Sequence, residues 1–455
     1  MSAALLKISE CLIMQRMQPL NIAVIGSGIS GLSAAWLLGS YHTVTLYEGD
    51  GRLGGHSNTV DVGGMPVDTG FIVYNEQTYP NLVAFLRHLQ VGTKPTEMSF
   101  SVSLDDGRFE YSGTNLGGLL AQPANVVRPR FWSMLRDLQR FYRDAPADIR
   151  DLGNVSLAEY LALRGYGAAF RDCHLFPMAA AIWSTPACDI GAYPAHAFIS
   201  FFENHGLLKM VRRPIWRTVS GGSRSYIDRF LKDFRGRIEL SRPVVRVVRH
   251  KGYVELIDKA GRAETFDHVV IAAHADQALA MLHDPTAQEN EVLGSFGYVA
   301  NEAVFHGDES LMPRRRRVWS SWNYSAATAG DPASGSVTYW MNRLQSLECK
   351  RSLFVTLNPL REPDPSMVIR RERYSHPRYD GRAVDAQEQL WSLQGGRRTW
   401  FCGSYFGAGF HEDGLQAGLA VAEALGGIVR PWRIPAESGR IKIRDAVPGR
   451  EMAYV

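Results

Sequence analysis

The chain has 455 residues, of which 45% are hydrophobic and 21% charged, and its formal net charge is +4. This composition is that of an ordinary soluble globular protein, and it excludes a disordered, collagen-like or disulfide-stapled chain. No apolar run approaches the about 18 residues that a membrane-spanning helix needs. The net charge is too small to predict nucleic-acid binding by itself.

The chain has five cysteines, none of them in a CxxC pair: Cys11, Cys173, Cys188, Cys349 and Cys402. Such an odd, widely spaced set argues against a disulfide framework and a cysteine-based zinc site, so we expect no metal. Residues 1–16 lack the apolar core and cleavage site of a signal peptide. We therefore expect a cytoplasmic protein whose first strand begins near Asn21.

A glycine-rich turn follows the first predicted strand. Residues 21–25 (NIAVI) have the β-branched, apolar character of a buried parallel strand, and a second strand at 43–47 ends at an acid. Between them lie a GxGxxG turn and a helical pattern that ends near Gly39. This context predicts a dinucleotide site, with the pyrophosphate over the helix N-terminus and the ribose on the acid. The acid disfavours a 2′-phosphate and hence NADP. The predicted contacts are Gly26, Ser27, Gly28, Ile29, Ser30, Gly31 and Glu48.

The next motif indicates which dinucleotide binds. Residues 48–55 have the pattern ExxxRxGG, in which Arg52 offers a fork of donors to a phosphate. This pattern, and the segment 67–72 (VDTGFI) after it, resemble the motifs of the flavin amine oxidase and carotenoid desaturase superfamily, which binds FAD. The resemblance implies further FAD contacts at Gly49, Arg52, Gly54, Gly55, His56, Ser57, Gly70, Phe71 and Ile72.

Two more elements of the superfamily follow in order. A helix predicted after residues 221–223 (GGS) leads to a strand pair near Ile238 and Val244, where Val244 has the position that meets adenine. Near the end, a strand and turn at 400–405 precede a helix that runs to Leu425 and whose N-terminus points at the flavin in the superfamily. The resemblance implies contacts at Gly403, Glu412, Asp413, Gly414 and Leu415. No cysteine has a covalent-flavin context, so we expect noncovalent FAD.

The resemblance also implies the organisation of the chain. We expect an α/β fold with a discontinuous Rossmann-type FAD-binding domain at 17–90, 215–285 and 385–430. An α+β substrate domain would occupy 91–214 and 286–384, followed by a tail at 431–455. Within the substrate domain the sequence predicts a hairpin at 99–111, strands at 337–341 and 353–357, and helices at 131–143 and 156–164.

Two segments combine arginines with aromatic residues. In 128–143, Phe131, Leu135, Leu138 and Tyr142 form one stripe of a predicted helix, and four arginines at 314–317 precede Val318 and Trp319. Such segments can lie in a membrane interface, which would place the protein peripherally at the inner face of the cell membrane. The alternative is a surface helix packed on the core and a solvated loop.

Longer phrases narrow the resemblance. Residues 71–82, 98–103, 339–345, 353–359 and 409–418 are similar to bacterial FAD proteins encoded beside methyltransferases of the cyclopropane fatty acid synthase type. This similarity implies a methyl-branched or cyclopropane-type acyl chain of a phospholipid as substrate, desaturation with flavin N5 as hydride acceptor, and a methyltransferase as partner. The catalytic candidates nearest the expected flavin are His411, Tyr405 and Tyr74.

Two alternatives remain at this point. The first is a flavin amine oxidase, but the strand at 298–304 carries Asn301 and Glu302 where such oxidases carry a lysine. The second is a non-catalytic, FAD-bound partner of a fatty acyl methyltransferase. Aromatic residues of the inserted segments, such as Trp183 and Phe201, would line an acyl tunnel or simply pack in the core.

Overall fold

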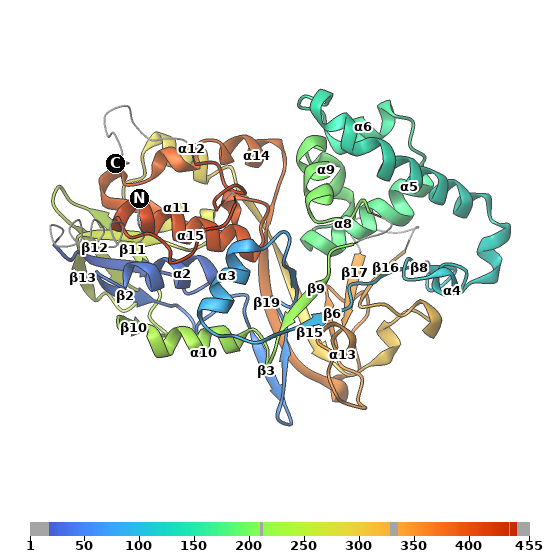
Figure 1. Cartoon of the computed structure of the whole chain (residues 1–455), viewed down its shortest axis with the longest axis horizontal. Coiled ribbons are helices and arrows are strands. Elements are labelled where there is room, and N and C mark those ends of the chain that lie inside the picture. The colour runs from blue at the N-terminus through green and yellow to red at the C-terminus, as the bar shows by residue number, and fades with distance from the viewer. Residues whose placement is uncertain (1–17, 210–212, 328–334, 436, 444–455) are drawn as a thin grey trace, which may run out of the picture.

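The computed structural model describes residues 18–209, 213–327, 335–435 and 437–443, which form two lobes (Figure 1). The left lobe in that view contains a parallel sheet, and the right lobe contains a larger mixed sheet with a group of helices above it. The expected α/β domain joined to an α+β domain is thus confirmed. Our predictions for residues 1–16 and for the end of the tail fall outside the described residues.

Strand β1 (Asn21–Ile25) lies at the centre of the parallel sheet and is buried from Ile22 onward. Val24 lies opposite Leu46 on one side and Val270 on the other. The carboxyl ends of the strands therefore meet at one edge, which is where open α/β sheets bind ligands. The sheet order is β10–β2–β1–β14–β20, with β10 (Arg237–Glu239), β2 (Thr43–Tyr47), β14 (His268–Ile271) and β20 (Thr399–Phe401).

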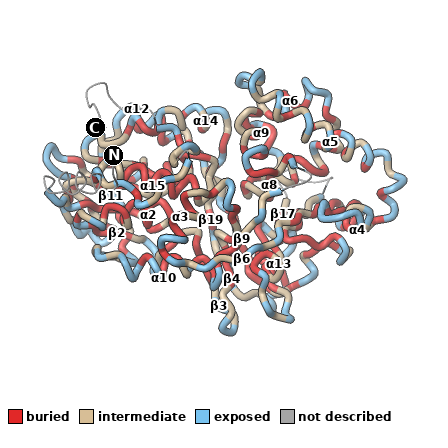
Figure 2. Tube along the Cα trace, in the orientation of Figure 1, coloured by how far each residue is buried: buried red, intermediate tan, exposed pale blue. Residues whose placement is uncertain are grey.

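Two helices pack closely against each other on this sheet. The first, α2 (Ile29–Leu38), follows the glycine-rich turn, and α15 (His411–Gly426) lies along it. A Cβ on Gly418 would lie 2.2 Å from the backbone oxygen of Ser30, so this approach requires glycine. Figure 2 shows buried residues concentrated around both helices. Further helices of this lobe are α3 (Pro80–His88), α10 (Arg224–Asp233), α11 (Ala275–Met281), α12 (Ala287–Leu293) and α14 (Gly381–Gln387).

The predicted strand pair near Ile238 and Val244 is wrong. Strand β10 joins the parallel sheet, whereas β11 (Val244–Arg249) pairs with β12 (Val254–Asp258), which in turn pairs with β13 (Ala263–Phe266). Ser241 has a φ of 52° and Pro243 follows it, so the chain turns between the two strands instead of returning along β10.

The second lobe is built on a seven-stranded sheet of order β19–β15–β18–β17–β16–β7–β8. Strands β7 (Phe100–Leu104) and β8 (Phe109–Ser112) form the predicted hairpin, and its turn residues Asp105, Asp106 and Gly107 all have positive φ. Met341, predicted to end a strand, begins α13 (Met341–Leu344) instead. The other strands are β15 (Gly297–His306), β16 (Trp322–Ala326), β17 (Gly335–Trp340), β18 (Phe354–Leu357) and β19 (Val368–Arg378).

Helices cover one side of this lobe (Figure 1). They are α4 (Leu116–Leu119), α5 (Pro129–Asp148), α6 (Leu157–Leu163), α7 (Ala168–Phe170), α8 (Phe176–Trp183) and α9 (Ala195–Asn204). Two small sheets complete the fold. One is the hairpin of β3 (Thr59–Val62) and β4 (Met65–Asp68), and the other is β5 (Tyr74–Asn75), β9 (Trp216–Val219) and β6 (Thr93–Thr96). Because β6 and β9 pair across a predicted domain boundary, the exact boundaries stay a prediction.

The apolar stripe of α5 faces the interior. Phe131 is fully buried, and Leu135, Leu138 and Tyr142 pack against the cores of this lobe. In the second basic segment, Trp319 is buried and Arg315 pairs with Glu110 at 2.7 Å. The stripe therefore belongs to the core, as in the alternative interpretation.

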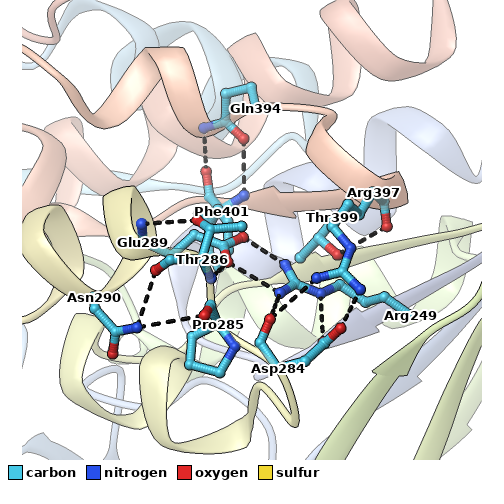
Figure 3. Close-up of polar contacts among 10 residues, drawn as sticks. All are labelled: Arg249, Asp284, Pro285, Thr286, Glu289, Asn290, Gln394, Arg397, Thr399 and Phe401. Atoms are coloured by element: carbon cyan, nitrogen blue, oxygen red, sulfur yellow. Dashed lines mark hydrogen bonds and ion pairs between the residues drawn. The ribbon is translucent and has the colours of Figure 1, made fainter.

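An ion-pair cluster around the buried Arg249 joins three parts of the first lobe (Figure 3). The guanidinium of Arg249, at the end of β11, lies 2.5 Å from Glu289 on α12 and 3.1 Å from Asp284. Arg397 pairs with the same Asp284, and Gln394 hydrogen-bonds both the N–H and the C=O of Phe401 on β20. The cluster thus fastens β11, the segment before α12 and β20 together.

Among its described residues the C-terminal tail forms no helix or strand, but side chains anchor it. Arg430, the residue before the tail, pairs with Glu423 at 2.7 Å and donates to the backbone oxygen of Glu437 in the tail at 3.2 Å. Arg440 lies 2.7 Å from Asp413 and donates to the backbone oxygen of Thr78 at 2.8 Å. The tail therefore ties α15 to the start of α3.

Candidate functional site

A cavity of about 910 Å³ is lined by residues of both lobes. One part of it follows the carboxyl ends of β1, β2 and β14, and another reaches α8, α9 and the seven-stranded sheet. Most of the predicted FAD-contacting residues line it: Gly26, Ser27, Gly28, Ile29, Ser30, Glu48, Gly49, Arg52, Gly55, His56, Gly70, Phe71, Ile72 and Val244.

The glycine-rich turn leaves room for a ligand at one position only. A Cβ on Gly31 would lie 1.9 Å from the backbone oxygen of Gly26, so Gly31 serves helix packing. A Cβ on Gly28 would meet nothing within 4 Å, which means that its Cα faces open space. No side chain caps α2, so the first N–H groups of that helix remain available to an anion.

Glu48 follows the last residue of β2 and lies at the cavity wall. Its carboxylate accepts hydrogen bonds of 2.9 Å from the backbone N–H groups of Ser27 and Asp50. Pro243 and Val244 line the wall beyond it. The carboxylate is therefore held in place next to apolar space, an arrangement that suits a ribose followed by an adenine.

The two loops after Glu48 lie against each other below the same cavity. Arg52 donates to the backbone oxygen of Gly55 at 2.9 Å, and Gly55 packs on Gly28, because a Cβ there would be 3.2 Å from the Cα of Gly28. Phe71 N–H donates to the backbone oxygen of His56 at 2.7 Å. A Cβ on Gly70 would lie 2.1 Å from that same oxygen, so glycine is needed at this contact.

His411, the first residue of α15, lines the centre of the cavity. Its ring stacks on Phe71 with centroids 3.6 Å apart, and its Nε2 lies 2.9 Å from the hydroxyl of Ser57. That hydroxyl lies 2.5 Å from the Tyr226 hydroxyl. Burial lowers the pKa of His411 to about 3, so the ring is neutral at physiological pH.

The sequence did not point to three further histidines that line the cavity, His205, His274 and His376. His376 on β19 accepts a hydrogen bond from Nδ2 of Asn301 at 3.0 Å. Asn301 lies on β15, at the position where we expected a lysine in an amine oxidase. The ring centroids of His376 and His56 lie 5.3 Å apart, and those of His56 and His274 lie 6.3 Å apart. Burial, and then the neighbouring His274, lower the pKa of His376 to about 4. Only the pairing of β15 with β19 brings Asn301 and His376 together, and no spacing motif records that contact.

Several predicted residues do not line the cavity. Tyr74 and Tyr405 are buried in the core of the first lobe, so their catalytic roles stay predictions without support from a position at the cavity. Glu412 instead accepts hydrogen bonds from the backbone N–H groups of Asn81 and Leu82 at the start of α3. The others that lie behind the wall are Gly31, Gly54, Ser57, Gly403, Asp413, Gly414 and Leu415.

The other part of the cavity is apolar. It is lined by side chains from α8, α9, β9 and the seven-stranded sheet: Met98, Ile182, Trp183, Phe201, Leu207, Trp216, Trp322, Tyr339 and Leu357. We call this part the apolar limb. Among the described residues that line the whole cavity, the only acidic ones are Glu48 and Asp50, which follow the end of β2.

The described part of the chain shows two further absences. None of its helices has the length and apolar character to cross a membrane. It also brings together no group of three side chains that could hold a metal ion.

Comparisons with known proteins agree with this geometry. The sequence profile of the family described as flavin containing amine oxidoreductase matches residues 29–312. A protein of Mycobacterium tuberculosis described as a flavin-containing monoamine oxidase, AofH, is 27% identical over 276 residues. That alignment covers 58% of this chain and 59% of AofH, so the chain spans about three fifths of the relative's length.

Two solved structures share the fold along nearly the whole chain. A variant of putrescine oxidase is 15% identical with a TM-score of 0.66, covering 90% of this chain and 98% of its own. The CLA-producing fatty acid isomerase from P. acnes is 14% identical with a TM-score of 0.61, covering 89% and 98%. The profile match spans more than half of the chain, and most of the residues predicted to contact a dinucleotide line the cavity. The chain therefore belongs to the family described as flavin containing amine oxidoreductase.

Proposed function

We propose that this FAD enzyme oxidises methyl-branched or cyclopropane-type acyl chains of phospholipids, and that it acts as a desaturase. The observation that carries the proposal is the apolar limb, which is lined by aromatic and aliphatic side chains and includes neither Glu48 nor Asp50. An uncharged hydrocarbon chain gains free energy by entering such a space, whereas a protonated amine would lose hydration there without an anionic partner. The choice of a modified acyl chain rests on the sequence phrases.

The residues of the cavity fit noncovalent FAD. The open Cα face of Gly28 and the uncapped start of α2 suit the pyrophosphate, and Glu48 suits the adenosine ribose. Arg52 offers a cationic fork beside them. Bound in this way, the flavin supplies hydride acceptance at N5.

The protein's own residues would position the substrate and take the second hydrogen. Burial keeps His411 neutral, which is the form that accepts a proton, and Ser57 holds its Nε2. His376 accepts at Nδ1 from Asn301, so its Nε2 carries the ring proton. We expect His376 to donate that proton in a hydrogen bond and to hold the substrate against the cavity wall.

Amine oxidation is the second candidate, because AofH and putrescine oxidase are similar to this chain. Two observations weigh against it. Asn301 stands on β15 where we expected the lysine of amine oxidases, and the apolar limb contains no carboxylate among its described residues. The fatty acid isomerase shows that a protein with this fold acts on a fatty acid.

The test is an anaerobic flavin absorbance titration of the purified holoenzyme. Phospholipid vesicles with methyl-branched acyl chains are compared with vesicles of unbranched chains, and an amine panel that includes putrescine is run in parallel. We expect bleaching by the branched lipid alone, with a product that has lost two hydrogens. Bleaching by an amine would establish amine oxidation instead, and a stably bound flavin that no substrate bleaches would leave the partner of a methyltransferase or a redox-neutral isomerase.

A further inference from the structure

Helix α4 and the start of α5 lie at the far end of the second lobe, at the right in Figure 1, and this segment has several exposed large apolar side chains. They lie on α4, on the 3₁₀ turn η1 (Pro123–Val127) and on the start of α5. We call this group the apolar tip, and its members are Leu116 (75% exposed), Leu120 (41%), Val126 (46%), Val127 (82%) and Trp132 (51%). Single exposed apolar residues are ordinary, but five of them within residues 116–132, two of which are joined by the hydrogen bond from Trp132 to Val126, indicate an interaction site.

The apolar tip is held on a rigid support. Gln122 accepts a hydrogen bond from the backbone N–H of Glu110 on β8 at 2.8 Å, and Asn125 donates to the backbone oxygen of the same residue at 2.9 Å. These bonds attach η1 to β8, the last strand of the seven-stranded sheet. The exposed side chains are therefore presented by fixed backbone and do not result from a loose loop.

Trp132 is arranged so that its ring can leave water at little cost. The indole Nε1 donates to the backbone oxygen of Val126 at 2.7 Å, while half of the side chain stays exposed. Its polar group is therefore already satisfied inside the protein. Burying the remaining ring surface in a lipid interface leaves no hydrogen-bond donor unpaired.

The charged residues of the segment that carries the tip are of one sign. From residue 113 to residue 136 the chain has three arginines, Arg128, Arg130 and Arg136, and no aspartate or glutamate. The turn η6 (Arg316–Val318) packs beside α4 and adds the exposed Arg317. The nearest acids in the sequence on either side, Asp137 and Glu110, are fully buried and pair with Arg140 and Arg315. An apolar surface with a basic surround is complementary to a bilayer that contains anionic lipids.

We propose that the apolar tip docks this protein on the surface of an anionic lipid bilayer, with Leu116, Val127 and Trp132 inserted and the arginines at the head groups. Trp and basic side chains prefer the interface between the head groups and the hydrocarbon core of a bilayer. The inserted apolar side chains and the arginines, each weak alone, together give reversible binding. The residues of the tip are not those of the predicted membrane contact, since the apolar stripe of α5 packs in the core. The inference goes beyond the proposed function, since it depends on surface exposure and charge and not on the cavity.

The experiment is co-sedimentation of the full-length holoenzyme with vesicles of phosphatidylcholine alone or mixed with phosphatidylglycerol. We expect binding to the mixed vesicles, weaker binding to phosphatidylcholine, and release as salt is raised, because salt screens the arginines. The double variant Leu116→Glu/Val127→Glu should lose at least tenfold in bound fraction. The matched control is Leu163→Glu on α6, a residue that is 77% exposed and lies outside the tip.

Two readouts separate docking from folding and from self-association. The flavin spectrum and the thermal midpoint of each variant should match the wild type, and sedimentation velocity without lipid should show the same species in all of them. Wild-type protein that stays in the supernatant with both vesicles overturns the proposal, as does equal binding by the double variant. A wild-type dimer that the double variant abolishes also overturns it, because the tip would then bind a second copy of the chain.

Discussion

The substitution Gly28→Ala tests the dinucleotide cradle most directly. The backbone at Gly28 has a φ of −64° and a ψ of 177°, which alanine adopts without strain, and its added methyl group would meet no protein atom within 4 Å. We therefore expect the apoprotein to keep its thermal midpoint. The methyl group would instead occupy the space assigned to the pyrophosphate and push it away from the N-terminus of α2.

The size of the effect follows from the bonds at stake. A hydrogen bond to a charged group contributes about 1.5–3 kcal/mol. Loss of one such bond weakens FAD binding by roughly ten- to a hundredfold, and loss of two weakens it further. Titration of the apoprotein with FAD, followed by flavin fluorescence, measures the dissociation constant.

Two comparison variants make the result specific. Gly381→Ala, at the start of α14, also adds a methyl group to open space and should leave both FAD affinity and stability unchanged. Gly31→Ala should lower stability even without FAD, because its Cβ would lie 1.9 Å from a backbone oxygen. If Gly28→Ala binds FAD within twofold of the wild type, the pyrophosphate does not lie on Gly28 and our placement of the cofactor is wrong.

Three further outcomes follow from the structure. Arg249→Met should lower the free energy of unfolding by about 3–5 kcal/mol, because it leaves Glu289 buried without its cation, whereas Arg371→Met, which breaks an exposed pair, should cost less than about 1 kcal/mol; urea denaturation measures both, and equal losses would contradict the assignment. The apoprotein should lose stability as the pH falls from 7 to 5, because His376 binds a proton near pH 6.5 in the unfolded state but only near pH 4 in the folded state. The variant His376→Gln should reduce this loss of unfolding free energy by about 2 kcal/mol. If the variant loses as much stability between the two pH values as the wild type, the prediction is refuted. Leu207→Asp, in the apolar limb, should slow flavin reduction by the branched lipid more than tenfold while FAD affinity stays unchanged, and Leu163→Asp should alter neither; a normal rate in Leu207→Asp would remove the acyl chain from this limb.

Much of the dinucleotide half could be predicted because its contacts are local. The turn at Gly26, the acid at Glu48 and the loop at Arg52 lie within 30 residues of each other, and each has a steric or electrostatic reason that a short pattern records. The structure places them around one cavity as expected. The hairpin of β7 and β8 was predictable for the same reason, since its turn sequence determines the pairing.

The parts that were missed depend on distant contacts. Glu412 looked like a cofactor contact beside His411, but Asn81 and Leu82, more than 300 positions away, take up its carboxylate. The pair of Asn301 and His376 depends on strand register, and the exposure of Val127 depends on which side of η1 packs against β8. Periodicity found the amphipathic helix α5, but it could not tell whether the apolar stripe faces lipid or the core.

The anchored C-terminal tail has a consequence for how the chain folds during its synthesis. The hydrogen bond from Arg440 to Thr78 joins residues 362 positions apart. In the parallel sheet, β1 pairs with β14 and β14 pairs with β20, so the sheet is incomplete until these later parts of the chain have been synthesised. Contacts of such long range form slowly and leave strand edges exposed meanwhile. The nascent chain should therefore depend on chaperones until synthesis ends, and it should acquire its cofactor only after release from the ribosome.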